Sequence, residues 1–267
     1  MNENVSIYNN EYKCMDDIDT GYINEFDKRV CDFLQRFHVR NYIIPAFISE
    51  EILRKSGYFK NSQHQLCEIA VAEPSRYHEV IQEETISKEN ARMSKMYLTP
   101  AVCLHVYPMF QNKKIDENIC ISTLGKAFRY EGGEHDGIQH LWEYHVRECI
   151  FIGNKEYVID SLKQVEDWIY QYAKSIYSDI EIKSASDSFY ESSRSKILQK
   201  IQLVNNLKQE LVMKIDGREI ALGSFNFHGT HFSKTYNFDD NGNIVTGCFG
   251  FGLERWLYLF KNIKEKK

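Results

Sequence analysis

The segment from Gly247 to Trp256 contains the most informative group of residues in this 267-residue sequence. Glycines at positions 250 and 252 allow a backbone to approach a ligand closely, and Arg255 follows in the first turn of a predicted helix, where phosphate charge is favoured. The spacing is not that of a dinucleotide-binding fold or a P-loop, because the third glycine and the Gly-Lys-Ser/Thr ending are missing. By itself, a Gly-x-Gly pair before a helix is more often a tight packing turn than a binding site.

A second candidate lies upstream, in Phe128-Arg129-Tyr130-Glu131 and in the stretch from Trp142 to Glu148. An arginine on a strand beside a hairpin loop can bind a phosphate through two hydrogen bonds, and an aromatic residue on the returning strand can stack on a base. The alternative is an ordinary β-hairpin with solvated charges.

In this order, the two segments resemble motifs 2 and 3 of the class II aminoacyl-tRNA synthetases, and Ile23 to Ser56 stands in the place of motif 1. The resemblance implies an α+β fold, in which an antiparallel sheet is flanked by helices, and activation of an amino acid by ATP. It also implies individual roles: Arg129 holds the ATP α-phosphate, Glu131 contacts the adenine end, Tyr144 stacks on the adenine, and Arg255 holds the γ-phosphate.

The chemistry of activation suits these residue types. When a carboxylate attacks the α-phosphate, negative charge develops, so the reaction needs cations and no covalent nucleophile from the protein. Arg129 and Arg255, together with Mg²⁺, would supply that positive charge. Glu219 resembles the magnesium-binding carboxylate of seryl-tRNA synthetases, although its spacing to Asn226 is one residue longer here.

Three further residues are candidates for the amino-acid pocket. Glu210 is on a predicted strand that faces the expected pocket, with a solvent-facing glutamate as the alternative. Thr99 and Asn226 are in segments that would border the same pocket, where either could instead make a strand-end hydrogen bond. The families that this sequence resembles handle small amino acids, so glycine, alanine and serine are the expected substrates.

Cys103, Glu148 and Cys248 form a candidate zinc site that spacing alone does not reveal, because the sequence has no Cys-x-x-Cys pair. The simpler interpretation is two buried thiols and a strand carboxylate. The three positions nevertheless resemble the Cys, Glu, Cys set of the archaeal zinc-dependent seryl-tRNA synthetases and of the amino acid:[carrier protein] ligases. That resemblance implies Zn²⁺ with an open position for the substrate amino group. Cys149 should point to the opposite face, because side chains alternate along a strand.

The resemblance leaves the acceptor of the activated amino acid to be decided. Few residues precede the predicted motif 1, and the formal net charge is -5, which weighs against tRNA. The sequence therefore favours transfer to the phosphopantetheine thiol of a carrier protein. The alternatives are a seryl-type tRNA synthetase without its tRNA-binding domain and a non-catalytic paralogue that acts as a regulatory or binding subunit. Because motif 1 commonly forms a dimer interface in this class, we expect a homodimer.

The elements that must position these residues follow from hydrophobic periodicity. We expect helices at Ile23 to Arg36, Ser49 to Ser56, Ile81 to Met96 and Asn154 to Tyr177, and a closing helix from about Leu253. We expect strands at Thr123 to Glu131, His140 to Gly153, Leu207 to Ile215, Glu219 to Phe227 and Lys234 to Asn237. Strands joined by short turns, with helices between them, predict an antiparallel α+β domain.

Composition sets the remaining expectations. A chain with 43% hydrophobic residues is long enough for one large domain over residues 1–267, with a loosely ordered start over residues 1–21. We find no export signal and no long uncharged apolar run, and the seven cysteines are scattered and odd in number. These features predict a cytoplasmic protein with no membrane partner.

Overall fold

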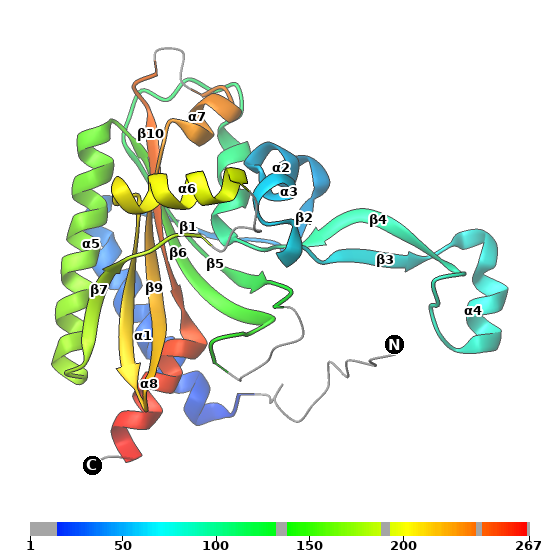
Figure 1. The fold of residues 1–267 in the computed structure, drawn as a ribbon, viewed down its shortest axis with the longest axis horizontal. Coiled ribbons are helices and arrows are strands. Elements are labelled where there is room, and N and C mark those ends of the chain that lie inside the picture. The colour runs from blue at the N-terminus through cyan, green and yellow to red at the C-terminus, as the bar shows by residue number, and fades with distance from the viewer. Residues whose placement is uncertain (1–14, 132–137, 188–192, 239–241, 266–267) are drawn as a thin grey trace.

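The body of the molecule is a seven-stranded sheet in the order β1-β5-β6-β10-β9-β8-β7 (Figure 1). The computed structural model describes residues 15–131, 138–187, 193–238 and 242–265. The strands are β1 (Arg40–Ile43), β5 (Ile119–Phe128), β6 (Glu143–Gly153), β7 (Ile180–Ser184), β8 (Lys208–Ile215), β9 (Arg218–Gly229) and β10 (Val245–Gly252). All neighbours pair antiparallel except β1 and β5. The predicted fold class is confirmed.

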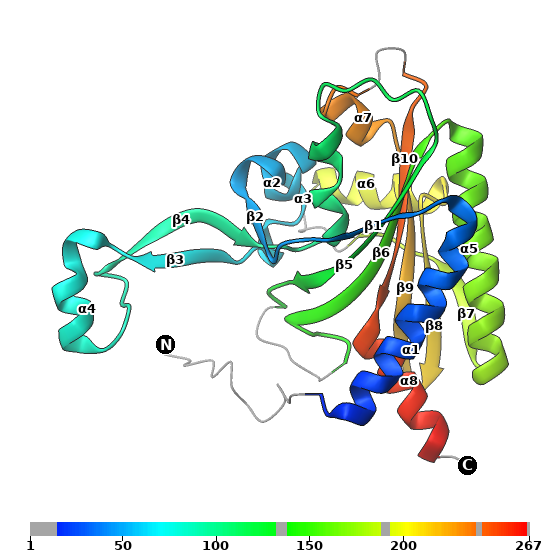
Figure 2. The same cartoon turned by 180° about the vertical axis from the view of Figure 1, so that it is seen from behind.

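Three long helices cover one face of this sheet, as Figure 2 shows. They are α1 (Asp17–Leu34), α5 (Lys155–Ile176) and α8 (Leu253–Glu265). Their apolar stripes provide the main core: Val158, Val165 and Ile169 of α5 are completely buried, and Trp256 of α8 stacks on Phe26 of α1 at 4.1 Å. The face covered by these helices therefore holds one hydrophobic core, and a second buried cluster lies between the opposite face and shorter elements.

Shorter elements cover part of the opposite face. They are α2 (Glu50–Ser56), α3 (Tyr58–Asn61), α6 (Ser193–Val204), α7 (His231–Thr235) and the 3₁₀ turns Gln35–Phe37, Gln63–Gln65, Pro74–Arg76, Val102–His105 and Tyr107–Phe110. The predicted limits of α2 are confirmed, because the Ser49 side chain caps its N-terminus and Gly57 ends it with a φ of 86°. In Figure 1, α6 crosses in front of the strands on this face.

A separate three-stranded sheet, in the order β2-β4-β3, leads into an arm that projects from the body (Figures 1 and 2). Its elements are β2 (Phe47–Ser49), β3 (Glu68–Ala72), α4 (Tyr77–Glu83) and β4 (Ala91–Leu98). The predicted helix from Ile81 to Met96 is wrong. The actual helix ends at Glu83, before Glu84 with its left-handed backbone, and the rest of that range is a turn followed by strand β4 from Ala91. The arm lies outside the core, so burial does not impose a readable period on its charged residues.

Several other boundaries differ from expectation. Residues 17–21 form the first turns of α1, because the Asp16 side chain caps the helix there. The predicted strand from Lys234 to Asn237 is wrong, because the chain turns through α7, whose Phe232 packs on the core together with Tyr236, four residues later. The loop from Gly132 to Gly137 lies outside the described residues.

The glycine-rich segment is not a turn. Gly247 to Gly252 is the second part of β10, which continues directly into α8. Within the described part of the chain, no helix is long and apolar enough to cross a membrane.

Candidate functional site

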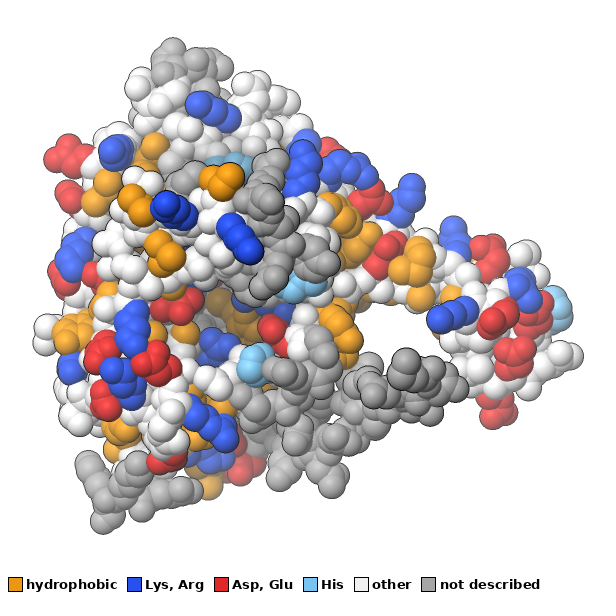
Figure 3. All heavy atoms as spheres, in the orientation of Figure 1, with side chains coloured by type: hydrophobic (Ala, Val, Ile, Leu, Met, Phe, Trp, Pro, Cys, Tyr) orange, Lys and Arg blue, Asp and Glu red, His pale blue; other side chains and the backbone are white. Residues whose placement is uncertain are grey.

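The floor of the candidate site is formed by two rows of directly paired residues on the face of the sheet away from α5. One row runs across four strands through Glu148, Gly250, Ser224 and Glu210. The next row contains Ile150, Cys248, Asn226 and Lys208. Because directly paired residues in a sheet point to the same side, these side chains share one surface. In Figure 3 this face is hollowed below α6.

Gly250 and Gly252 have no side chains, so the backbone of β10 is accessible in the middle of this surface. A Cβ atom added at Gly252 would lie 3.7 Å from Arg255 Cδ and 3.8 Å from Tyr144 Cδ2, which are ordinary contacts. At Gly250 it would lie 3.3 Å from Val146 Cγ1 and would force a small shift. The protein itself therefore tolerates a side chain at Gly252, and its absence leaves space for a ligand to lie against the strand.

Arg129 and Arg255 meet over one aromatic ring. Each guanidinium carbon lies 5.8 Å from the centre of the Tyr144 ring. Arg129 Nε donates to the Pro100 carbonyl at 3.0 Å, and Arg255 donates to three backbone carbonyls in the segments 138–139 and 221. Tyr144 is the largest influence on the pKa of Arg129, which is raised, so this group stays cationic. The structure thus brings together three of the predicted ATP-binding residues.

The remaining predicted ATP ligands lie at the margins of the site. Glu131 is close enough for its charge to raise the pKa of Arg129 further. Glu219 is 53% exposed and forms ion pairs with Lys183 and, at 4.0 Å, with Lys214. A magnesium ion bound by Glu219 would have to displace or rearrange these lysines. The magnesium role of Glu219 stays a prediction.

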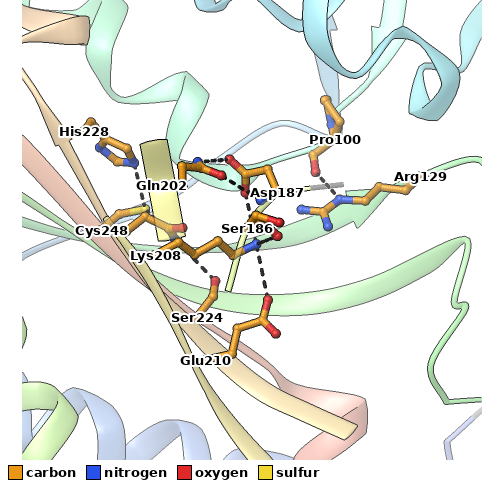
Figure 4. Close-up of polar contacts among 11 residues, drawn as sticks. Pro100, Arg129, Ser186, Asp187, Gln202, Lys208, Glu210, Ser224, His228 and Cys248 are labelled. Atoms are coloured by element: carbon orange, nitrogen blue, oxygen red, sulfur yellow. Dashed lines mark hydrogen bonds and ion pairs between the residues drawn. The ribbon is translucent and has the colours of Figure 1, made fainter. Parts of the chain in front are cut away.

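Of the three residues predicted to form the amino-acid pocket, Glu210 and Asn226 lie on the floor of the site. Glu210 Oε1 lies 3.3 Å from Lys208 Nζ (Figure 4), and Asn226 Nδ2 lies 3.3 Å from Ser224 Oγ and 3.8 Å from Cys248 Sγ. Thr99, in contrast, is fully buried, and its hydroxyl contacts His105 Nε2 at 2.9 Å. The Thr99 hydroxyl is therefore already engaged inside the protein.

Cys103, Glu148 and Cys248 form a three-residue cluster, the only group of this kind among the described residues. Their ligand atoms lie within 4.8 Å of one another, and all three residues are buried. The Cys103 backbone N–H donates to Glu148 Oε2 at 2.9 Å, which fixes the carboxylate. Cys103 comes from the 3₁₀ turn Val102–His105, Glu148 from β6 and Cys248 from β10. Segments that are far apart in the sequence therefore bring these three residues together, as the resemblance implied.

The electrostatics of this cluster suit a divalent cation. A hydrogen bond with Cys103, together with burial, raises the pKa of Cys248 well above its usual range, and burial raises the pKa of Glu148. The hydrogen bond with Cys248 favours the thiolate of Cys103, but burial and the Glu148 charge outweigh it, so that pKa is also raised. Deprotonating these three neighbouring acids costs free energy because their negative charges are buried together, and a bound cation would offset that cost. Two thiolates and one carboxylate are a ligand set that fits Zn²⁺ with a fourth position open.

Cys149 points to the other face, as predicted. It packs in the core beneath the helices, and its Sγ lies 3.3 Å from Cys120 Sγ. This arrangement separates Cys149 from the metal-ligand cluster and removes the ambiguity between neighbouring residues 148 and 149.

Sequence reasoning missed several polar residues that border the site. Lys208 Nζ lies 3.0 Å from Asp187 Oδ1, and Gln202 of α6 donates to the same carboxylate (Figure 4). His228 Nε2 lies 3.6 Å from Cys248 Sγ. The alternation along β8 and β9 was the available signal, since Lys208 and His228 stand two residues from Glu210 and Asn226, respectively, and therefore share their face.

Comparison with known proteins gives a consistent relationship. No family model matches the sequence. The chain is 26% identical over 235 residues to the type-2 serine–tRNA ligase of Methanocaldococcus jannaschii, and this match covers 80% of this chain and 45% of that protein. It is also 26% identical over 242 residues to the type-2 serine–tRNA ligase of Methanococcus aeolicus, with 82% and 46% covered. The chain thus spans about half the length of the curated relatives that it matches.

A solved structure has the same fold. It is the crystal structure of A. aeolicus tRNASec in complex with M. kandleri SerRS, with a TM-score of 0.72 and 19% identity, and the match covers 88% of this chain and 51% of that chain. This match establishes the class II synthetase-type catalytic fold. The sequence similarity is to type-2 serine–tRNA ligases in particular.

Proposed function

We propose that this chain activates a small amino acid with ATP. The amino-acid carboxylate oxygen would attack the α-phosphorus, the bond to the β-phosphate oxygen would break, and an aminoacyl adenylate and pyrophosphate would form. One observation carries this proposal: Arg129, Arg255 and Tyr144 meet at one end of a glycine-lined strand, and Cys248 of the same strand belongs to a cluster of metal-ligand type.

The phosphate and adenine contacts are the ones that the family resemblance implies, and the arrangement of these three residues supports them. Tyr144 would stack on the adenine, and Glu131 would contact its outer edge. Arg129 would hold the α-phosphate where charge develops, and Arg255 would hold the γ-phosphate. Both guanidinium groups already have fixed backbone partners, so little reorganisation is needed when ATP binds. Mg²⁺ would accompany ATP, with Glu219 as a further ligand.

The amino-acid end would be set by the three-residue cluster of Cys103, Glu148 and Cys248. Zn²⁺ bound there would supply a Lewis-acid position for the substrate amine. Asn226 lies beside Cys248, and Glu210 lies on the neighbouring strand, so both would border the substrate side chain. The names of the similar proteins make serine the first amino acid to test, followed by glycine and alanine.

The acceptor is the finer part of the proposal. The similarity to serine–tRNA ligases and the fold of the tRNA-bound synthetase favour tRNA as the acceptor. The sequence alone favoured a phosphopantetheinylated carrier protein as the acceptor and gave a seryl-type tRNA synthetase as an alternative. The comparisons favour that alternative. The carrier protein remains the second candidate, because segments around Asp187 and Lys208 resemble those of the carrier-protein ligases. The net charge of -5 favours neither acceptor decisively.

Activation and transfer are tested in one assay series. Zinc-loaded protein, ATP and each candidate amino acid are incubated with hydroxylamine, which should trap the adenylate as a hydroxamate. The same reaction with tRNA or with a phosphopantetheinylated carrier should then give an aminoacyl ester or a thioester. Hydroxamate with neither acceptor product would restrict the function to activation. Absence of hydroxamate with every amino acid would support the non-catalytic alternative.

A further inference from the structure

Three side chains lie directly behind the metal-ligand cluster and connect its two thiols. His228 Nε2 lies 3.6 Å from Cys248 Sγ, and its Nδ1 lies 3.2 Å from Thr246 Oγ1 and 3.3 Å from Tyr107 Oη. The Tyr107 hydroxyl is also close enough to the Cys103 thiol to favour its thiolate form, which by itself lowers the pKa of Cys103. Figure 4 shows the His228 ring directed at Cys248. Each thiol of the cluster therefore has its own polar partner outside the ligand set.

The proton positions in this network can be assigned by counting donors. The sulfur of a thiolate only accepts, so His228 must present Nε2–H to Cys248, which leaves Nδ1 as an acceptor. The Thr246 hydroxyl can donate to Nδ1, and the Tyr107 hydroxyl is then free to donate to Cys103. In this arrangement both thiolates receive a hydrogen, and Asn226 Nδ2 is a further donor to Cys248 at 3.8 Å.

Packing holds the network in place before any ligand binds. Tyr107 and Thr246 are fully buried. The Tyr107 ring stacks on Phe232 at 3.7 Å and 7°, and Phe232 meets the His228 ring edge-on at 5.0 Å. His228 is not part of the set whose ligand atoms lie within 4.8 Å of one another. It therefore acts on the thiol, and the fourth metal position stays open for a substrate.

We propose that Tyr107, His228 and Thr246 are positioning residues that donate a hydrogen bond to each thiolate and thereby set the affinity of the cluster for zinc. This inference rests on the zinc site of the proposed function. Two thiolates and a carboxylate leave a bound Zn²⁺ with a net negative charge of one, which weakens its attraction for an amine lone pair. Donors to the sulfur atoms withdraw part of that charge and fix the sulfur positions. Thr246 has an indirect part, because it sets the tautomer of His228.

The test uses substitutions that remove one donor while preserving shape. In Tyr107→Phe the stack on Phe232 is kept and only the hydroxyl is lost; His228→Ala removes the N–H, and His228→Gln restores a donor near Nε2. Tyr236→Phe is the matched control, because Tyr236 is buried in the same core cluster and its hydroxyl has no hydrogen-bond partner among the described residues. Zinc affinity is measured by competition with a chromogenic chelator. Circular dichroism of each metal-free variant verifies folding.

We expect Tyr107→Phe and His228→Ala to weaken zinc binding by about 10–100-fold, the usual effect of removing an outer-shell partner. His228→Gln should recover most of the loss, and Tyr236→Phe should bind zinc as the wild type does. With Co²⁺ in place of zinc, the thiolate-to-metal charge-transfer band should shift in His228→Ala and return in His228→Gln. Unchanged zinc affinity and an unchanged cobalt band in folded Tyr107→Phe and His228→Ala would overturn the inference. Wild-type protein that binds no zinc would instead contradict the zinc site itself.

Discussion

The guanidinium carbons of Arg129 and Arg255 both lie 5.8 Å from the centre of the Tyr144 ring. Arg129 directly follows the end of β5, and Arg255 is in the first turn of α8. Two cations beside one ring repel each other, and each arginine also contacts backbone carbonyl oxygens, which stabilise its charge. A polyanion placed between them removes it. The pair is therefore arranged for a ligand with several phosphates.

Loss of either arginine should abolish most adenylate formation. Arg129→Gln and Arg255→Gln each remove a positive charge from the developing negative charge, so we expect a decrease of about 100–1,000-fold in the rate of hydroxamate formation. Arg92→Gln is the control, because Arg92 is an exposed arginine on the projecting arm. Rates within a factor of about three of wild type for both site variants would remove the arginine pair from the mechanism.

Gly252→Ala should weaken ATP binding without harming the fold. The added Cβ meets Arg255 and Tyr144 at ordinary distances, so the temperature of unfolding should not fall. A methyl group pressed against a bound nucleotide costs about 1–3 kcal/mol, and about 1.4 kcal/mol is a factor of ten, so the KM for ATP should rise roughly 5–150-fold. Gly21→Ala, in α1 with open space around its Cα, is the matched substitution that should leave KM unchanged.

Zinc content should depend on the predicted ligands and on pH. Cys103→Ser and Cys248→Ser should lose the metal, and Cys120→Ser, on the opposite side of the sheet, should retain it. The pKa values of Cys103, Glu148 and Cys248 are all raised in the metal-free cluster, so zinc must displace protons. Zinc affinity should therefore increase as the pH rises, with protons released on binding. Calorimetry in buffers of different ionisation enthalpy would show no buffer dependence if this explanation is wrong.

His105 should make the metal-free fold sensitive to acid. Burial lowers its pKa from the ordinary 6.5 to about 4, so the unfolded chain binds the proton more readily. The stabilisation is fully present above pH 6.5 and is lost as the pH falls from 6.5 towards 4. Urea unfolding across this range should show a smaller decrease in the free energy of unfolding for His105→Gln than for wild type. Equal decreases in the two proteins would contradict the assignment.

The main sheet and helices could be predicted from the sequence because burial imposes a period on them. Helix α5 carries an apolar residue at each turn facing the sheet, and the β5–β6 hairpin is bounded by glycines. The arm and α7 could not be predicted in the same way. The arm has few buried residues, so its strands show no alternation, and α7 is too short for a helical period.

The site divides along similar lines. Arg129, Tyr144 and Arg255 converge as the family resemblance implied, and so do Cys103, Glu148 and Cys248. Alternation along β9 places His228 on the same face as Asn226, but its contact with Cys248 depends on the packed structure. Tyr107 is in a 3₁₀ turn, where the sequence has no period that would place its side chain beside a thiol. Single-domain organisation and homodimer formation stay predictions.

Amino-acid-dependent exchange of labelled pyrophosphate into ATP tests the central claim most directly, because it requires formation and reversal of the adenylate and no acceptor. We predict exchange by the zinc-loaded wild-type protein with at least one of serine, glycine and alanine, and its loss in Arg129→Gln. Zinc-loaded, folded protein that gives no exchange with any amino acid would contradict the proposal that this chain activates an amino acid.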